Sequence, residues 1–370
     1  MKKEIGLYVH IPFCVRKCAY CDFASFAGRE QDEAAYVDAV LREAEKRSCI
    51  DAAVATLYIG GGTPSLLPPE LMERLLSGIR SCFDFLSDAE CSCECNPGTV
   101  TPAFLDTLER NGVNRLSFGA QAAQPHLLSL LGRIHSWEQA EESVRMARQA
   151  GFDNINLDLM LGLPNQTLSN VRETLEKALA LEPTHLSCYG LIVEEGTKMR
   201  RMVESGAWTL PDEDTERDMY ELCRETLAQH GFEQYEISNF ARPDFACRHN
   251  ADCWKRKEYI GLGSAACGFL GNVRYQNPPD LTDYLNGKPA EETVISPEEA
   301  RFESMMLGLR MTEGVSDAAF RKMHGISIHD VFGKQLEKPI RLGLVEWHNG
   351  FLRLTRKGMD VQNSVLVELL

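Results

Sequence analysis

The first half of the chain alternates between two patterns of apolar residues. Short apolar or β-branched runs are followed by longer stretches in which apolar residues recur every three or four positions. The short runs predict strands, and the longer stretches predict amphipathic helices with one buried face. This alternation is typical of βα units around a parallel sheet. The predicted strands are Gly6–Ile11, Thr56–Gly60, Cys91–Cys95, Arg115–Gly119, Asn154–Met160 and His185–Leu191.

Amphipathic helices are predicted between these strands. In the first, Tyr36, Val37 and Val40 fall on one side and the charged residues on the other. Six βα units are too few to close an eight-stranded barrel, yet polar motifs follow the strand ends, where α/β folds place their sites. We therefore expect an α/β fold with a partial (β/α)6 TIM-like barrel. The predicted helices are Glu33–Arg47, Pro69–Cys82, Pro102–Asn111, Trp137–Ala150, Leu168–Leu181 and Asp212–His230.

The remainder of the chain suggests two further parts. Residues 1–238 would form the barrel core, and 239–295 a connecting segment that closes the barrel mouth. Asn277–Asp280 and Asn286–Glu292 look like linkers because they are rich in turn-forming and polar residues. Residues 296–370 predict a winged-helix-like module with a hairpin turn at His348-Asn349-Gly350. Its elements would be Pro297–Met311, Asp317–His324, Ile328–Leu336, Leu344–Trp347 and Phe351–Leu354.

Charge and composition narrow the range of functions expected for this chain. The net charge of −15 argues against a general nucleic-acid binder, and residues 297–370 balance ten basic with ten acidic side chains. No apolar stretch has transmembrane length, and no signal peptide is visible, so a cytoplasmic protein is expected, with peripheral membrane contact left open. Thirteen cysteines in such a chain point to metal or redox chemistry rather than a disulfide framework.

The strongest chemical motif follows the first predicted strand. Cys14, Cys18 and Cys21 stand in a CX3CX2C spacing, and three thiolates so close in sequence can surround one iron–sulfur cubane. Three ligands for four irons leave one iron open. A closed zinc site needs four ligands and usually a second cysteine pair, and buried inert thiols are the other alternative.

Two further strand ends carry candidate groups. Gly60-Gly61-Gly62-Thr63-Pro64 lets the backbone approach a ligand closely, and its N–H groups are candidates to hold the polar end of that ligand. Glu94 ends the third strand on the opposite face from its neighbouring cysteines, which we interpret as buried small hydrophobes without a role.

The CX3CX2C motif, with Tyr20 before the last cysteine, resembles the radical-SAM superfamily. The resemblance implies a [4Fe–4S] cluster on Cys14, Cys18 and Cys21, with S-adenosylmethionine chelating the open iron. Three later motifs, Arg115–Gln121, Leu131–His135 and Asn156–Pro164, resemble the oxygen-independent coproporphyrinogen III oxidases and their close relatives over almost the whole chain. The positions then implied for S-adenosylmethionine are Tyr8, Tyr20, Gly61, Gly62, Thr63, Glu94, Gln121, Arg133 and Asp158.

The residues after the third cysteine distinguish the branches of this family. The oxidases generally carry another cysteine where this chain has Phe23, and Cys21-Asp22-Phe23 resembles the heme-chaperone (HemW-type) branch. That branch implies heme binding and transfer to an acceptor protein, supported by an electron donor such as flavodoxin or ferredoxin. The oxidase activity is the alternative.

The implied heme region departs from the pattern of that branch. His249 is the implied heme ligand, within residues 239–295. Cys253 stands where a tyrosine is usual, and Cys267 where a histidine is usual. Histidine and cysteine both ligate heme iron, so the first change either preserves heme binding or alters the mode of attachment. The alternative for His249 is a histidine satisfied by hydrogen bonds near the barrel mouth.

Overall fold

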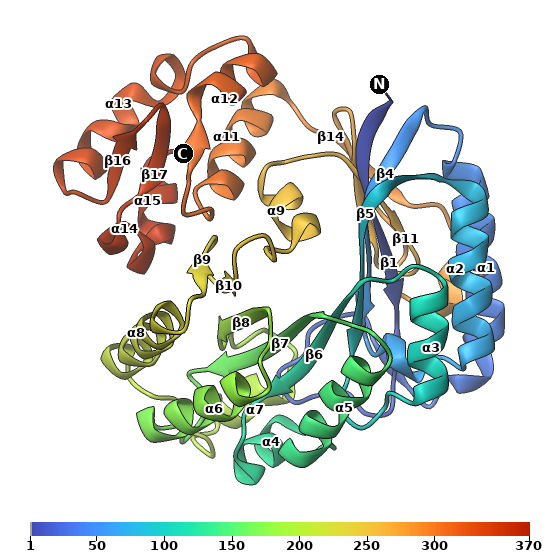
Figure 1. The fold of residues 1–370 in the computed structure, drawn as a ribbon. Helices are drawn as coiled ribbons and strands as arrows, with labels where there is room; N and C mark the ends of the chain where they lie inside the picture. Colours follow the sequence, from blue (N-terminus) through green and yellow to red (C-terminus); the bar gives the residue numbers. More distant parts are fainter. Residues whose placement is uncertain (1) are drawn as a thin grey trace.

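One curved sheet of twelve strands dominates the protein, whose computed structural model describes residues 2–370 (Figure 1). Its centre is six parallel strands that follow one another in chain order. Among the described residues, the sheet runs openly from β14 to β9, in agreement with the expected α/β fold and partial barrel. The central strands are β1 (Lys3–Ile11), β4 (Ala52–Gly61), β5 (Asp84–Cys95), β6 (Arg115–Gln121), β7 (Asn154–Leu161) and β8 (His185–Gly190).

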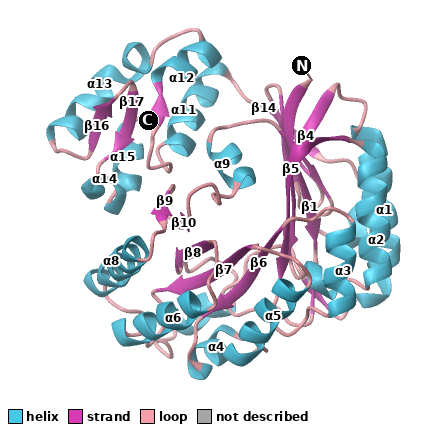
Figure 2. Cartoon of the chain, viewed as in Figure 1, coloured by secondary structure: helices cyan, strands magenta, loops and turns pink. Residues whose placement is uncertain are grey.

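Helices cover the outer face of this sheet (Figure 2). Each predicted barrel helix is present with its ends within one residue of the prediction: α1 (Glu33–Arg47), α2 (Pro69–Cys82), α3 (Pro102–Arg110), α5 (Trp137–Gln149), α6 (Leu168–Ala180) and α8 (Glu213–Gln229). The sequence missed α4 (Pro125–Leu131) and α7 (Lys198–Glu204). Both have only seven residues, too few to display a helical period.

The two faces of the central strands differ in polarity. On β4 and β5, Leu57, Ile59 and Cys93 point outward into the main apolar core. The residues that alternate with them, such as Tyr58 and Glu94, point to the inner side of the curve. The strands therefore bury a conventional core against the helices and keep their polar groups for the interior.

The segment after α8 extends the sheet at both edges. At the β8 edge, β10 (Asn239–Ala241) and β9 (Glu233–Gln234) pair antiparallel. At the other edge β11 (Tyr259–Leu262) pairs parallel with β1, followed by β12 (Cys267–Leu270), β13 (Val273–Gln276) and β14 (Glu291–Val294). Strands from both sides of residue 238 belong to this one sheet, so the domain boundary expected at residue 238 stays a prediction.

The linker prediction for this segment is wrong. Asn277 is buried, and its amide donates a hydrogen bond to Glu43 on α1 at 2.9 Å. Tyr284 on α10 (Leu281–Leu285) donates to the same carboxylate at 2.8 Å. The last two residues of the second stretch, Glu291 and Glu292, begin β14. Polar residues here serve tertiary hydrogen bonds, which composition alone does not reveal.

The C-terminal residues build a second apolar core around Met305, Phe320 and Leu352. The predicted hairpin is present, with positive φ of 49° at Asn349 and 83° at Gly350, and the winged-helix-like interpretation agrees with the elements. These are α11 (Pro297–Gly308), β15 (Val315–Ser316), α12 (Asp317–His324), α13 (Ile328–Arg341), β16 (Val345–His348), β17 (Phe351–Leu354), α14 (Arg356–Asp360) and α15 (Gln362–Glu368). Glu303 ties this part to the barrel through Arg256 at 2.9 Å and Arg274 at 2.8 Å.

No helix in residues 2–370 combines the length and apolar character needed to cross a bilayer.

Candidate functional site

A cavity of about 390 Å³ opens where the parallel strands end. We call it the cofactor cavity. Its wall combines the three motif cysteines with eight of the nine positions expected to bind S-adenosylmethionine. These residues come from six separate stretches of chain, so only folding brings them together. They are Cys14, Cys18, Cys21, Tyr20, Gly61, Gly62, Thr63, Glu94, Gln121, Arg133 and Asp158.

Backbone contacts hold the cysteine loop, residues 14–25, in shape. Its base is a short parallel ladder between β2 (Phe13–Cys14) and β3 (Phe26–Ala27). At its far end, Ala19 donates to the Leu131 carbonyl at 2.8 Å and accepts from the Met199 N–H at 2.8 Å. Helices α4 and α7 thus clamp the loop between its second and third cysteines.

The three thiols suit attachment at separate corners of a cluster. Cys14 Sγ lies 3.6 Å from the Thr63 hydroxyl, and Cys18 Sγ lies 3.7 Å from the Arg133 guanidinium. Within residues 2–370, no three His, Cys, Asp or Glu side chains converge closely enough to hold a single metal ion. In a cubane each thiolate binds a different iron, so three cysteines around one cavity fit that group.

Positions 60–62 require glycine because neighbouring atoms leave no room for a side chain. A Cβ on Gly60 would lie 2.9 Å from the Glu94 carboxyl carbon, and one on Gly62 would lie 2.7 Å from the Phe13 carbonyl oxygen. Gly61 has a φ of +112°, which favours glycine. The expectation that their N–H groups hold a ligand is wrong, because all three from Gly61 to Thr63 bond within the protein. These residues can offer carbonyl oxygens instead, which are acceptors suited to an amino group.

Glu94 is held on the wall by two donors. Its carboxylate accepts from the Tyr58 hydroxyl at 2.9 Å and from the Gly61 N–H at 3.0 Å. Burial, followed by the nearby Asp158 carboxylate, raises the pKa of Glu94 from 4.5 to about 7. Ionisation of Glu94 near neutral pH therefore has an energetic cost that a cationic ligand group beside it would relieve.

Asp158, Gln121 and Arg133 also line the cavity. Asp158 accepts from Ser117 at 3.1 Å and Asn156 at 2.8 Å, while burial raises its pKa. Gln121 has a φ of 66° where the β6–β7 register shifts, a strained geometry that turns its side chain to the cavity. Arg133 donates to the Gly119 carbonyl at 2.7 Å.

Tyr8 is the one expected cofactor residue that does not line the cavity. It stacks behind Tyr58, with ring centroids 6.4 Å apart, and its hydroxyl lies 2.9 Å from His10 Nδ1. His10 Nε2 in turn lies 2.8 Å from the Ala24 carbonyl in the cysteine loop. Tyr8 therefore sits where it orients the loop.

The sequence interpretation missed Asn96, which lines the cavity. Its amide donates to the Thr63 hydroxyl at 2.8 Å, and its carbonyl accepts from Arg133 at 2.7 Å. Asn96 thus links the glycine turn to the arginine. Its place directly after the end of β5, two residues beyond Glu94, was the available signal.

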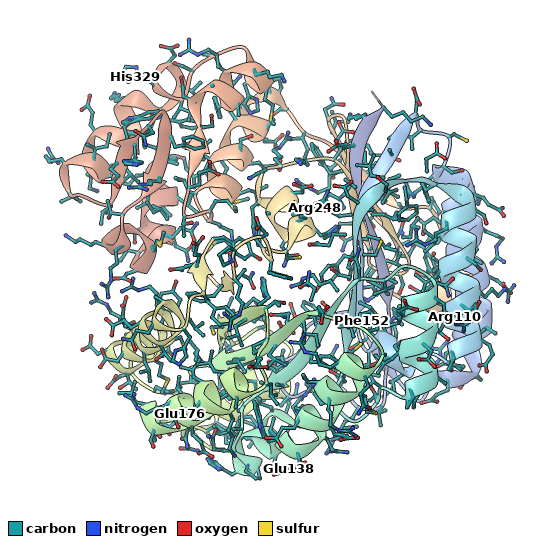
Figure 3. All side chains as sticks on the ribbon, viewed as in Figure 1. Arg110, Glu138, Phe152, Glu176, Arg248 and His329 are labelled. Atoms are coloured by element: carbon teal, nitrogen blue, oxygen red, sulfur yellow. The ribbon has the colours of Figure 1, made fainter. Side chains whose placement is uncertain are left out.

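His249 lies deeper than the cofactor cavity. It belongs to α9 (Arg248–Trp254), which sits on the inner side of the sheet, as Figure 3 shows from the label on Arg248. His249 is buried, with Nδ1 2.9 Å from the Thr56 hydroxyl and its ring stacked on Tyr58 at 5.3 Å. Burial lowers its pKa to about 4, so the imidazole is neutral and competent as a ligand.

The two unexpected cysteines lie near each other. Both Cys253 and Cys267 are close enough to Tyr259 to contribute, after burial, to its raised pKa of about 12. Both thiols are half-buried, and burial raises their own pKa values. The two departures thus share one neighbourhood at the β11 edge.

Comparisons with known proteins agree on one family. The Radical SAM superfamily profile matches residues 8–178, and the HemN C-terminal domain profile matches residues 295–361. The heme chaperone HemW of Lactococcus lactis subsp. lactis is 36% identical over 374 residues, covering 100% of this chain and 98% of that protein. The heme chaperones HemW of Bacillus subtilis and Escherichia coli are 36% and 35% identical, each covered over 97% of its length.

A solved structure supports the same assignment. The radical SAM coproporphyrinogen III oxidase HemN of Escherichia coli superposes with a TM-score of 0.87 at 26% identity, covering 100% of this chain and 90% of that one. The sequence motifs, the cavity and these matches lead to one conclusion. This chain belongs to the radical SAM superfamily, in the family of the HemW proteins.

Proposed function

We propose that this chain is a cytoplasmic heme chaperone that holds a [4Fe–4S] cluster and S-adenosylmethionine, binds heme and delivers it to an acceptor protein. The observation that carries the proposal is the convergence of three cysteines and eight expected cofactor residues on one cavity. The full-length similarity to proteins named heme chaperone supports the same choice.

Different residues of the cavity would bind the cluster and S-adenosylmethionine. The cluster supplies an open iron for chelation and one-electron chemistry when it is bound on Cys14, Cys18 and Cys21. Glu94 and the glycine carbonyls are acceptors for the amino group of S-adenosylmethionine, and Asp158 is an acceptor for ribose hydroxyls. The Arg133 guanidinium compensates negative charge beside Cys18.

Heme binding at His249 requires α9 to move. The imidazole is buried beneath the cavity, and Glu90 accepts the N–H groups of Arg248 at 3.0 Å and His249 at 3.1 Å. Asp88 also accepts from Arg248, and Thr56 lies within hydrogen-bond distance of His249, so a few side-chain hydrogen bonds hold this seven-residue helix. An element of this size is small enough to be displaced locally. We infer that heme is taken up by an opened form of α9, with Cys253 as a further candidate ligand.

Heme titration of the full-length protein tests the proposal. Wild type should develop a Soret band and pass heme to an apo-acceptor such as a heme-free cytochrome. The His249→Ala variant should weaken the band, and Cys253→Ala shows whether the thiol participates. The His230→Ala variant serves as control, because His230 is an exposed histidine at the end of α8. An unchanged band in His249→Ala would remove that residue from the heme site.

The oxidase is the second candidate, favoured by the structural match to the Escherichia coli coproporphyrinogen III oxidase. Against it stands Phe23, which is 60% exposed on the wall of the cofactor cavity at the position where the resemblance expects a cysteine in oxidases. Anaerobic incubation of reconstituted protein with coproporphyrinogen III, S-adenosylmethionine and reductant decides between them. Protoporphyrinogen formation would favour the oxidase, and its absence would favour the chaperone.

A further inference from the structure

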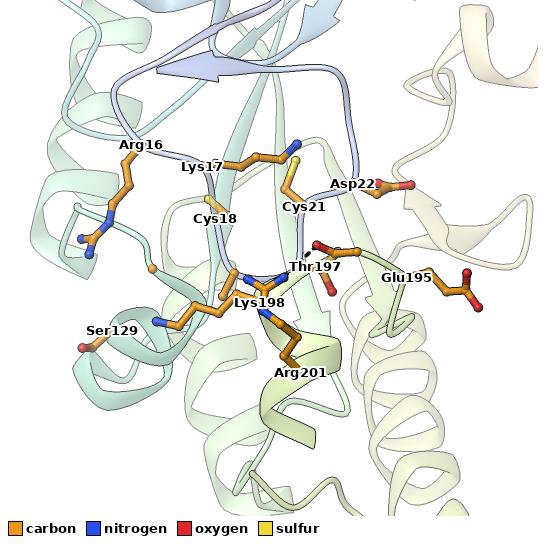
Figure 4. A pocket seen from close by; sticks show the side chains of 13 residues that line it. Arg16, Lys17, Cys18, Cys21, Asp22, Ser129, Glu195, Thr197, Lys198 and Arg201 are labelled. Carbon is orange, nitrogen blue, oxygen red and sulfur yellow. Dashed lines mark hydrogen bonds between the residues drawn. The ribbon is translucent and has the colours of Figure 1, made fainter. Parts of the chain in front are cut away.

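A second cavity, of about 490 Å³, also borders the cysteine loop, and Figure 4 shows the residues that line it. We call it the basic cavity. The loop contributes Arg16, Lys17, Cys18 and Cys21, and α7 faces them. The remaining lining residues that carry charge are Asp22, Glu195, Lys198 and Arg201.

Four cations converge here without carboxylate partners. Among the ion pairs of residues 2–370, none joins Arg16, Lys17, Lys198 or Arg201 to an acid within 4.0 Å. Lys17 donates to the Phe23 carbonyl at 2.9 Å and Arg201 to the Gly196 carbonyl at 3.2 Å, which are neutral partners. Asp22 and Glu195 also line the cavity, so its four cations leave an excess of positive charge, which is unusual in a chain of net charge −15.

The basic side chains keep a defined place relative to the cysteines. Met199, which follows Lys198 on α7, is fully buried and donates its N–H to the Ala19 carbonyl in the cysteine loop at 2.8 Å. Ala19 stands between Cys18 and Cys21. The helix that supplies half of the positive charge is thus joined to the segment that would hold the cluster.

Cys18 and Cys21 line both cavities. The cysteine loop is therefore a thin partition, with the expected S-adenosylmethionine site on one side and the basic cavity on the other. A cofactor bound in the first cavity would cover that face of a cluster. The basic cavity is the approach that brings an external electron carrier near the same two cysteines.

We propose that the basic cavity is the docking surface for an acidic one-electron carrier protein that reduces the cluster. The inference rests on the cluster assignment within the proposed function. One electron leaves the reduced carrier and enters the oxidised cluster, so the carrier is oxidised by one electron and no bond forms or breaks. Complementary charge raises the rate of encounter and selects this face.

The chain offers a matched control surface. A cavity of about 520 Å³ beside α1 is also basic, with exposed Arg42 and Lys46, but no cysteine lines it. Charge reversal at Arg42 and Lys46 changes the net charge as much as reversal at Lys198 and Arg201. The two double variants therefore separate local docking from the overall charge of the protein.

The experiment uses the full chain, reconstituted anaerobically, and reduced flavodoxin as the probe. Affinity is measured by titration at low and high salt, and cluster reduction is followed by stopped-flow absorbance and EPR. K198E/R201E should bind iron and sulfide like wild type and react equally fast with dithionite, which needs no docking surface. Its affinity for flavodoxin and its rate of reduction by flavodoxin should fall by about tenfold or more at low salt.

The outcomes are distinct. R42E/K46E should stay within about twofold of wild type, and added salt should weaken wild-type binding, because exposed charges are screened. Equal losses in both variants, or unchanged flavodoxin binding in K198E/R201E, would overturn the docking surface. Binding of inorganic phosphate that does not compete with flavodoxin would show a small-anion site instead. Failure of wild type to take up iron and sulfide would refute the cluster assignment itself, before any docking is measured.

Discussion

The charge on Glu94 gives the sharpest test of the site. Replacing Glu94 with Gln removes an ionisable group that accepts hydrogen bonds from Tyr58 and Gly61 while keeping its size. In the protein without cofactors we expect the variant to be more stable than wild type at alkaline pH. We expect the same variant to bind S-adenosylmethionine more weakly.

The magnitude follows from the pKa of Glu94, raised from 4.5 to about 7 chiefly by burial. Because this carboxyl binds a proton more readily in the folded state, the free energy of unfolding of the protein falls as pH rises from about 4.5 to about 7. At roughly 1.4 kcal/mol per pKa unit, ionised Glu94 costs the folded protein about 3 kcal/mol above that range. The amide resembles the protonated acid, so the advantage of Glu94→Gln should be about 3 kcal/mol at pH 8 and about 1 kcal/mol at pH 5.

Urea unfolding of the cofactor-free protein at both pH values measures this difference. Glu109→Gln is the control, since Glu109 is exposed on α3, away from the cavity. Its midpoint should match wild type at both pH values. Binding of S-adenosylmethionine to reconstituted Glu94→Gln, followed by calorimetry, should weaken by tenfold or more, on the order of 1.4 kcal/mol for a charge-assisted hydrogen bond.

Two results would refute the reasoning. If Glu94→Gln destabilises the protein equally at pH 5 and pH 8, the carboxylate carries no electrostatic cost in the empty cavity. If its affinity for S-adenosylmethionine equals that of wild type, Glu94 does not contact the cofactor.

Three other perturbations have expected outcomes. Gly62→Ala forces a Cβ to within 2.7 Å of the Phe13 carbonyl and should cost about 1–3 kcal/mol and lower iron content, whereas Gly190→Ala, with open space around it, should retain iron. Arg133→Lys keeps the charge but cannot reproduce the planar fork, and should weaken S-adenosylmethionine binding about tenfold by calorimetry. Burial of Glu303 is outweighed by hydrogen bonds from two arginines, which lower its pKa. Glu303→Gln should therefore cost about 2 kcal/mol of unfolding free energy near pH 7, measured by urea unfolding. That cost should vanish once pH falls below the pKa of Glu303 in the folded protein.

Much of the fold was predictable because the responsible forces are local. Helices such as α1 and α2 match the prediction at both ends, since their apolar spacing and flanking residues act within a few turns. The inner and outer faces of β5 followed from strand alternation, which separates Glu94 from its buried cysteine neighbours. Short or late elements such as α7 and β14 lack such local signals.

The candidate site also combines features that local sequence signals predict with features that depend on the fold. Spacing alone identified Cys14, Cys18 and Cys21 as one group, because loop closure brings residues so close in sequence together at little entropic cost. Sequence gave no account of why the glycine N–H groups are engaged internally or why Tyr8 stands behind the wall, since both depend on strands packed side by side.

By itself, the sequence determined the βα order, the cysteine motif and the family, each recorded in short-range patterns. Only the tertiary structure decided that His249 is buried under the cavity and that Lys198 and Cys18 line one cavity. No short-range sequence pattern predicts that residues 18 and 198 lie close together. Their meeting is set by the curvature of the sheet and by the single backbone hydrogen bond between Met199 and Ala19.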